Sequence, residues 1–278
     1  MALVEVSVKD RVAEVTLNRP EKLNAMNPQL LQEFDAALER LKNDADVSCI
    51  LLAGSGRAFS VGYDLVGFRP SGGSPVSEDV YDDWVHLRSI TQRWLDLWDY
   101  PKPVVSAVHG YCLAGALFMA SCTDLVVVSK DCVLAWARIP LGAAWLTGVG
   151  ALSFGVRKAK ELSMIRGSQL TGEDAHALGW ANYALPTDEV LPKARELAKG
   201  ISRTPLDLLI LNKRYGNQAM DRAGFREAIT GGIEFNVIAH HSPGGKYVRA
   251  KLAELGLNGA IEWFDSGGTT TANISGEK

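Results

Sequence analysis

The sequence has 278 residues, of which 47% are hydrophobic and 22% charged, and can bury the core of one large domain or of a domain with an appendage. The net charge of -3 at pH 7 and the absence of a long basic run argue against a nucleic-acid-binding protein. No segment reaches the roughly 18 apolar residues that a membrane span requires, and the charged, alternating N-terminus does not resemble a signal peptide.

The four cysteines lie within or beside apolar runs and form no CxxC pair, so we expect buried free thiols in a reducing compartment. We therefore expect a cytoplasmic protein with no membrane partner, no nucleic-acid partner and no metal site. The adjacent pair His240-His241 does not have the spacing of metal ligands.

Short strands alternate with helices in the first part of the chain. Residues 4–8 and 13–17 alternate apolar and polar side chains and predict a hairpin. Asn27-Pro28 begins a helix with apolar side chains at helical spacing, and a buried strand follows at 48–52. Residues 57–65 keep neither the strand nor the helix period, which indicates a surface loop.

A Gly/Pro/Ser stretch at residues 69–77 is expected to be mobile, and a long helix with Trp84, Trp94 and Trp98 on one face follows it until Pro101.

Residues 104–128 are the centre of the predicted fold. They read as a β-branched strand (104–108), a glycine-bearing turn (109–115), an apolar helix (116–122) and a second buried strand (125–128). A glycine directly before a helix lets a ligand approach unpaired backbone amides, so Gly115 is a candidate anion or oxyanion site. The alternative is that Gly110 and Gly115 only permit tight packing.

The remaining elements complete an α/β core followed by helices only. We expect a strand at 133–136, a loop at 137–150, helices at 158–165 and 172–178, a strand at 181–185 and a helix at 190–202. Helices at 206–220, 222–240 and 246–255 come next. The predicted division is a core over residues 1–200, a helical region over 201–265 and a disordered tail over 266–278.

Five segments, taken in order, resemble the crotonase (enoyl-CoA hydratase/isomerase) superfamily over about residues 3 to 255. They are NRPEKLNAMN at 18–27, GRAFSVGYDL at 56–65, PKPVVSAVHGYCLAGA at 101–116, Asp124 after the helix, and LTGEDAHALGWANYALP at 170–186. The resemblance implies a spiral of ββα repeats with a helical C-terminal trimerisation region, hence a homotrimer or a dimer of trimers. It also implies that a coenzyme A thioester is the substrate and that no separate cofactor is required.

The same motifs imply where the acyl-CoA binds. The thioester oxygen would accept hydrogen bonds from the amides of Tyr63 and Gly115, which do not depend on side-chain identity, while the Tyr63 ring would narrow or line the acyl pocket. Lys22, Leu23 and Ala25 match positions that contact coenzyme A, although Lys22 also reads as an ordinary solvated lysine. The other predicted substrate-binding residues are Ala58, Val61, Gly62, Leu65, Tyr111, Leu113, Ala114, Phe118, Trp136 and Trp145.

The sequence departs from the family at its acid/base positions. Hydratases of this family use two glutamates, and here Phe118 and Arg138 stand at those positions. Neither side chain can act as the base for water, so ordinary hydratase chemistry is in doubt. The dehalogenase aspartate falls on Ala144, and the isomerase glutamate falls near Trp145 or Leu146. No Asp or Glu lies between Asp131 and Glu161, so a small shift in alignment cannot supply a carboxylate.

Few other groups could carry chemistry. Asp64 could act as a base or serve a structural role, and His86 could reach the pocket or simply be packed. Tyr63 or Tyr111 could donate a proton. Arg138 could bind an acidic acyl group or a phosphate, or could form a salt bridge with Asp124 or Asp131. Trp136 and Trp145 suggest an aromatic-lined pocket, or only good packing.

Three hypotheses follow. The first is an acyl-CoA enzyme, of lyase or isomerase type, that acts on a bulky or aromatic acyl chain by stabilising a thioester enolate, with atypical acid/base groups. The second is a non-catalytic acyl-CoA-binding or regulatory homologue. The third is a variant that hydrolyses a carbon–carbon bond or a thioester with water held by Asp64 or His86. Sequence alone does not give the acyl group or the reaction.

Overall fold

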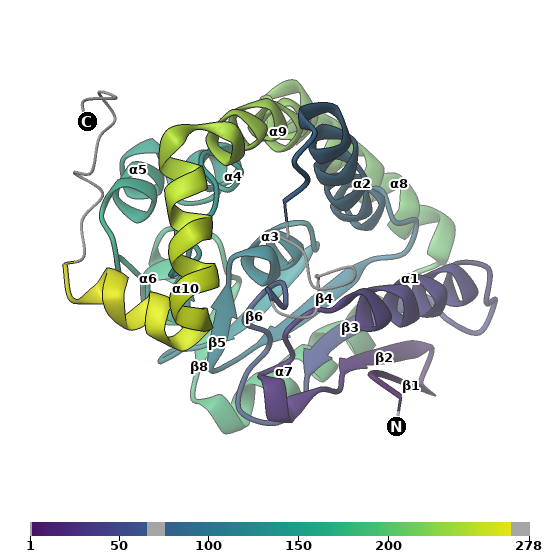
Figure 1. Ribbon diagram of the computed structural model, residues 1–278. Helices are drawn as coiled ribbons and strands as arrows, with labels where there is room; N and C mark the ends of the chain where they lie inside the picture. Colours follow the sequence, from purple (N-terminus) through teal and green to yellow (C-terminus); the bar gives the residue numbers. More distant parts are fainter. Residues whose placement is uncertain (1, 66–75, 268–278) are drawn as a thin grey trace, which may run out of the picture.

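The computed structural model describes residues 2–65 and 76–267. It is a mixed α/β fold in which a strand-rich first part is followed by a helical C-terminal part (Figure 1). Residues 69–75 of the stretch predicted to be mobile and residues 268–278 of the predicted tail lie outside the described residues.

The described strands form a six-stranded and a two-stranded sheet. The larger sheet has the order β1-β2-β3-β4-β6-β8, in which only the β1–β2 pair is antiparallel, and the smaller sheet pairs β5 with β7 in parallel. The strands are β1 (Val4–Lys9), β2 (Val12–Leu17), β3 (Cys49–Gly54), β4 (Val104–Val108), β5 (Tyr111–Leu113), β6 (Leu125–Ser129), β7 (Val133–Ala135) and β8 (Tyr183–Leu185).

The central strands are apolar throughout because both faces of the sheet are covered. In β3, Ile50 and Leu52 join the main core, whereas Leu51 and Ala53 face a second core with α7 (Thr187–Ile201). The main core lies on the other face of the sheet and includes side chains of α1 (Pro28–Lys42) and α3 (Gly115–Ser121), which lie opposite α7 in Figure 1. The alternation of side chains along one strand therefore separates two layers of helices.

Local sequence signals fix several helix starts. Asn27 caps α1, since its side-chain oxygen accepts a hydrogen bond from the Leu30 amide at 2.8 Å, and Pro28 occupies the first turn. Asp79 caps α2 (Val80–Trp98) in the same way. The other helices are η1 (Pro20–Lys22), α4 (Thr147–Ser153), α5 (Val156–Met164), α6 (Gly172–Ala177), α8 (Leu206–Arg222), α9 (Phe225–His241) and α10 (Pro243–Asp265).

The last helix folds back over the first part of the chain. α10 bends at Gly256, where φ is 67°, a conformation that glycine adopts at little cost. Its side chains pack in one cluster with Ile139, Leu141 and Leu65, and Figure 1 shows the change of direction in the yellow segment. The end of the helical region therefore covers the loop that follows β7.

Three predicted boundaries are wrong. The predicted turn at 109–115 contains the short strand β5, and the predicted loop at 137–150 ends in α4. The last predicted helix, 246–255, is too short, because α10 runs through the bend to Asp265. In α4, the backbone of Ala228 approaches Gly148 and the ring of Trp136 approaches Gly150, so long-range packing decides a helix whose two glycines argue against it.

Candidate active site

Residues 57–65, predicted as a surface loop, form a segment held on both sides by backbone hydrogen bonds. On one side, Met26 N donates to Gly62 O at 2.8 Å and Asp64 N donates to Met26 O at 3.0 Å. On the other side, Leu113 N donates to Ser60 O at 3.1 Å. The segment therefore lies between residues 23–26 and β5 without belonging to a regular sheet. We call this arrangement of residues 57–65, residues 23–26 and β5 the clamp.

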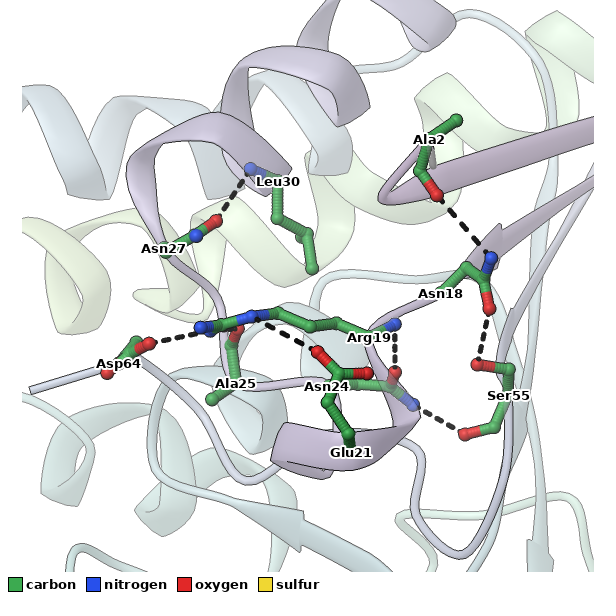
Figure 2. A network of polar contacts seen from close by, with 10 residues as sticks. All are labelled: Ala2, Asn18, Arg19, Glu21, Asn24, Ala25, Asn27, Leu30, Ser55 and Asp64. Carbon is green, nitrogen blue, oxygen red and sulfur yellow. Dashed lines mark hydrogen bonds and ion pairs between the residues drawn. The ribbon is translucent and has the colours of Figure 1, made fainter. Parts of the chain in front are cut away.

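A buried asparagine and an ion pair fix this clamp (Figure 2). Asn24 is fully buried, and its side-chain amide donates to Ser55 O and Ala58 O, both at 2.8 Å. Arg19 Nη1 donates to Ala25 O at 2.9 Å and to Asp64 Oδ2 at 2.6 Å. Figure 2 shows the Arg19 side chain extending between these groups, so Asp64 ties the end of the segment to the chain entering α1.

The direction of the Tyr63 amide follows from peptide geometry. The Gly62–Tyr63 peptide is trans, because no cis peptide bond occurs among the described residues. The C=O and N–H groups of a trans peptide point in opposite directions. Since Gly62 O faces Met26 N, the Tyr63 N–H points away from residues 23–26.

The turn from β5 into α3 presents a second amide. Ala114 has φ 49° and ψ -116°, a strained conformation for an alanine, and this residue reverses the chain into the helix. Phe118 N donates to Ala114 O at 3.1 Å, so the Gly115 N–H of the same peptide unit points outward from the helix start.

The two glycine-containing turns are in direct contact. A Cβ atom built on Gly62, whose φ is 87°, would lie 3.1 Å from Gly115 N and 2.7 Å from Leu113 O. Only a glycine allows this approach of backbone to backbone. The structure therefore brings residues 62–63 and 113–115 together.

Aromatic side chains from four parts of the chain surround this contact. The Tyr63 hydroxyl accepts a hydrogen bond from Trp94 Nε1 of α2 at 2.8 Å, and its ring stacks on Trp145, with centroids 5.9 Å apart and planes at 6°. Phe118 of α3 meets Trp145 edge-on at 5.7 Å. Burial raises the pKa of the Tyr63 phenol well above its ordinary range, so the phenol is a weak proton donor.

Comparison with known proteins shows to which family the chain belongs. The family model described as enoyl-CoA hydratase/isomerase matches residues 7–237. The chain belongs to the enoyl-CoA hydratase/isomerase family, and so to the crotonase superfamily.

Its relatives cover most of the chain. The Mycobacterium tuberculosis protein EchA13, whose name includes enoyl-CoA hydratase, is 31% identical over 263 residues, which are 87% of this chain and 81% of that protein. The structure of an enoyl-CoA hydratase/isomerase from Xanthobacter autotrophicus Py2 has a TM-score of 0.86 at 28% identity, covering 95% of this chain and 98% of the other. A structure named as an enoyl-CoA hydratase from Mycobacterium smegmatis has a TM-score of 0.83 at 29% identity, covering 95% of this chain and 94% of the other.

Phe118 and Arg138, which the resemblance predicts to stand where family hydratases carry their glutamates, have no carboxylate. Phe118 is fully buried in the aromatic group described above. Arg138 is largely exposed and forms an ion pair with Asp265 of α10, which also lies 3.6 Å from Arg166. The predicted alternative, a salt bridge from Arg138 to Asp124 or Asp131, is wrong. Asp124 instead pairs with Lys213 at 2.8 Å, and the carboxylate of Asp131 accepts from the Thr187 hydroxyl.

The other predicted substrate-binding residues fall into two groups. Those that build or adjoin the clamp are Leu23, Ala25, Ala58, Val61, Leu113 and Ala114. Tyr111 also adjoins the segment, because its carbonyl oxygen accepts from Ser60 N at 3.0 Å, but its side chain is exposed, and Leu65 at the end of the segment packs against the α10 cluster. Lys22, which is exposed, and Trp136 lie outside the segment. The Trp136 ring packs on Phe154 of the segment after α4, and its indole nitrogen is buried with no hydrogen-bond partner among the described residues.

A polar cluster between α2 and α9 is not apparent from the sequence. Asp83, only 1% exposed, accepts a hydrogen bond from His240 Nδ1 at 2.9 Å, and His241 Nε2 lies 3.3 Å from the same carboxylate oxygen. Asn236, one turn before His240, accepts from the Ala143 amide at 3.0 Å. Asn236 therefore ties the loop that carries Trp145 to α9. The two partners of the Asp83–His240 bond are 157 residues apart, so spacing gave no signal of it.

His86 lies one turn after Asp83 on α2. Burial lowers the pKa of His86, and the nearby Asp83 carboxylate partly opposes this shift. In residues 2–65 and 76–267, no group of three or more His, Cys, Asp or Glu side chains is arranged to hold a metal ion. Nor does the described part of the chain contain a helix that is both long and apolar enough to cross a membrane.

Proposed function

We propose that the chain is an acyl-CoA enzyme that holds the thioester oxygen between the backbone amides of Tyr63 and Gly115. The observation that carries this proposal is the contact between Gly62 and the Gly115 amide, together with the outward direction of both N–H groups. Family membership supports the ligand class, because the relatives are named as enoyl-CoA hydratases.

Two such donors would stabilise an enolate or a tetrahedral oxyanion formed from the thioester. Preorganised donors act strongly in a site from which water is excluded, and removal of one typically reduces turnover by a factor of about 10² to 10³. The surrounding rings of Tyr63, Trp94, Phe118 and Trp145 support such a dry site. Because the donors are backbone groups, the unusual tyrosine at position 63 retains this function.

The proposed chemistry differs from hydration. With Phe118 and Arg138 in place of both glutamates, no carboxylate remains at those positions to activate water or to protonate carbon. We therefore propose enolate stabilisation with a proton supplied by another group, as in a lyase or isomerase of atypical type. Asp64 is a weak candidate for a base, because Arg19 holds its carboxylate at 2.6 Å.

A second candidate function is acyl-CoA binding without turnover. The complete burial of Phe118 against Trp145 favours it, because apolar side chains fill the position where the base would act. In the hydrolytic variant, His86 or Asp64 would act as the base. It would be excluded if His86→Gln and Asp64→Asn both left an observed hydrolysis unchanged.

We also propose a homotrimer or a dimer of trimers, located in the cytoplasm, with residues 201–265 as its assembly region. α8 has no buried residue in the single chain and exposes Leu208, Leu211 and Tyr215. α9 exposes Phe235 and Ile238. Helical faces of this kind are commonly covered by identical subunits. The four buried free cysteines support a reducing compartment.

The test combines binding with turnover. Calorimetric titration with crotonyl-CoA and with free coenzyme A should give tighter binding of the thioester, because only the thioester has a carbonyl oxygen for the two amides. A panel of enoyl-, β-ketoacyl- and aryl-CoA compounds, followed by mass spectrometry, then separates enzyme from binder. Equal affinity for free coenzyme A and every thioester would contradict the proposed role of the amides.

A further inference from the structure

The Tyr63 ring is fixed beside the proposed oxyanion site from three directions. A Cβ atom built on Gly115 would lie 2.5 Å from Tyr63 Cε2 and 2.8 Å from Cδ2, so the edge of the ring rests directly on the Gly115 backbone. The hydroxyl at the far end accepts from Trp94 Nε1, and the ring face stacks on Trp145. The ring thus spans the space from the second amide to helix α2.

The groups that hold the ring are themselves fixed. Trp94 is fully buried, and Trp145 Nε1 donates to Thr91 Oγ1 of α2 at 3.2 Å. A rotation of the Tyr63 side chain would leave the Trp94 indole N–H without its acceptor inside the core. A buried donor without an acceptor is costly, so the observed position of the ring is strongly favoured.

An acyl group bound through its carbonyl to residues 63 and 115 would begin next to this ring. Its first carbons can lie against the Gly115 backbone, but a longer chain directed toward α2 meets Tyr63, Trp145 and Phe118 packed on one another. We infer that Tyr63 is a specificity-determining residue that closes the acyl site, so that the protein accepts short acyl groups, such as acetyl to butyryl, and excludes long ones. This inference rests on the proposed function.

A chain-length series tests it. Calorimetry would measure the affinity of the wild-type chain for butyryl-, hexanoyl-, octanoyl- and decanoyl-CoA, and then that of Tyr63→Ala, which keeps the backbone amide and removes the ring. Burial of one methylene contributes about fourfold in affinity when the site has room for it. We expect no gain beyond butyryl-CoA for the wild type, and a gain on the order of a hundredfold from butyryl- to octanoyl-CoA for Tyr63→Ala.

Two further variants separate ring volume from other effects. Tyr63→Phe keeps the ring and should keep the wild-type profile, whereas Tyr183→Ala removes a half-exposed tyrosine from β8 and controls for the substitution itself. The gain in affinity from butyryl- to octanoyl-CoA that we expect for Tyr63→Ala should be absent from both of these variants.

The outcomes distinguish the inference from the proposed function. If the affinity of the wild-type protein rose steadily from butyryl- to decanoyl-CoA, the inference that Tyr63 closes the acyl site would be wrong, whereas the proposed thioester site would stand. This measurement requires no variant. The same profile in Tyr63→Phe and Tyr63→Ala would refute the role of ring volume. If the wild type and every folded variant bound neither coenzyme A nor any of its thioesters, the proposed function and the inference would both fail.

Discussion

Replacement of Gly115 by alanine perturbs the centre of the proposed site. The new methyl group would lie 2.5 Å from Tyr63 Cε2 and 2.8 Å from Cδ2, which is closer than real Cβ atoms approach other atoms. The ring cannot yield easily, because Trp94 binds its hydroxyl and Trp145 covers its face. Either the ring or the turn that carries the Gly115 amide must move.

The expected magnitude follows from two opposing effects. Overpacking a filled core costs about 1–3 kcal/mol, whereas alanine is favoured over glycine in a helix by about 1 kcal/mol. We expect a net loss of up to about 2 kcal/mol in the free energy of unfolding. If displacement of the turn removes one donor, thioester affinity or turnover should fall on the order of a hundredfold.

Denaturant unfolding and calorimetry with butyryl-CoA measure the two quantities. Gly200→Ala is the matched control, because a Cβ at this α7 position meets nothing within 4 Å, so this variant should be as stable as the wild type or more stable. A Gly115→Ala protein with both the wild-type free energy of unfolding and the wild-type thioester affinity would refute the reasoning, since the new methyl group would then displace neither the Tyr63 ring nor the turn.

Three further predictions concern charges and thiols. Asp64→Asn should lower the free energy of unfolding by about 1–3 kcal/mol, because it leaves the largely buried Arg19 with only the exposed Glu21 carboxylate, 3.9 Å away; an unchanged urea midpoint would contradict this. Lys213→Met should cost about 3 kcal/mol at pH 7 by leaving Asp124 uncompensated. Burial already raises the pKa of Asp124, so its charged form destabilises the fold above that pKa. The loss of unfolding free energy in Lys213→Met should therefore shrink as the pH falls toward 4 and Asp124 becomes protonated. A loss that does not change with pH would contradict this. Burial raises the pKa of Cys49 and Cys132 to about 12 and also raises the pKa of Cys112 and Cys122. At pH 8 a thiol reagent should therefore react slowly with the native protein, and it should label all four thiols once the protein is denatured. Rapid labelling of the native protein would contradict this.

The sequence was most informative where the chain repeats a local pattern or a family motif. The apolar runs of β3, β4 and β6 predicted buried strands, and both faces of these strands are covered. The family motifs around Gly62 and Gly115 drew attention to two distant turns whose backbones are in contact, and the shared oxyanion site of the Tyr63 and Gly115 amides stays a prediction.

It was least informative where contacts between distant residues decide the structure. The partner of Arg138 is Asp265, and the partner of Asp83 is His240; neither pair has a local signature. The same holds for α4, which forms against the neighbouring Trp136 and Ala228 although it contains two glycines. The Tyr63 ring could be predicted to narrow the acyl pocket, but its hydrogen bond to Trp94 and its stacking on Trp145 required the structure.

The central claim is that one thioester oxygen accepts hydrogen bonds from the amides of residues 63 and 115. A crystal structure with butyryl-CoA bound tests it directly. We predict that the carbonyl oxygen lies about 2.7–3.1 Å from both backbone nitrogens. A bound thioester whose oxygen contacts neither amide, or an amide bonded to a carbonyl of the protein itself, would contradict the account.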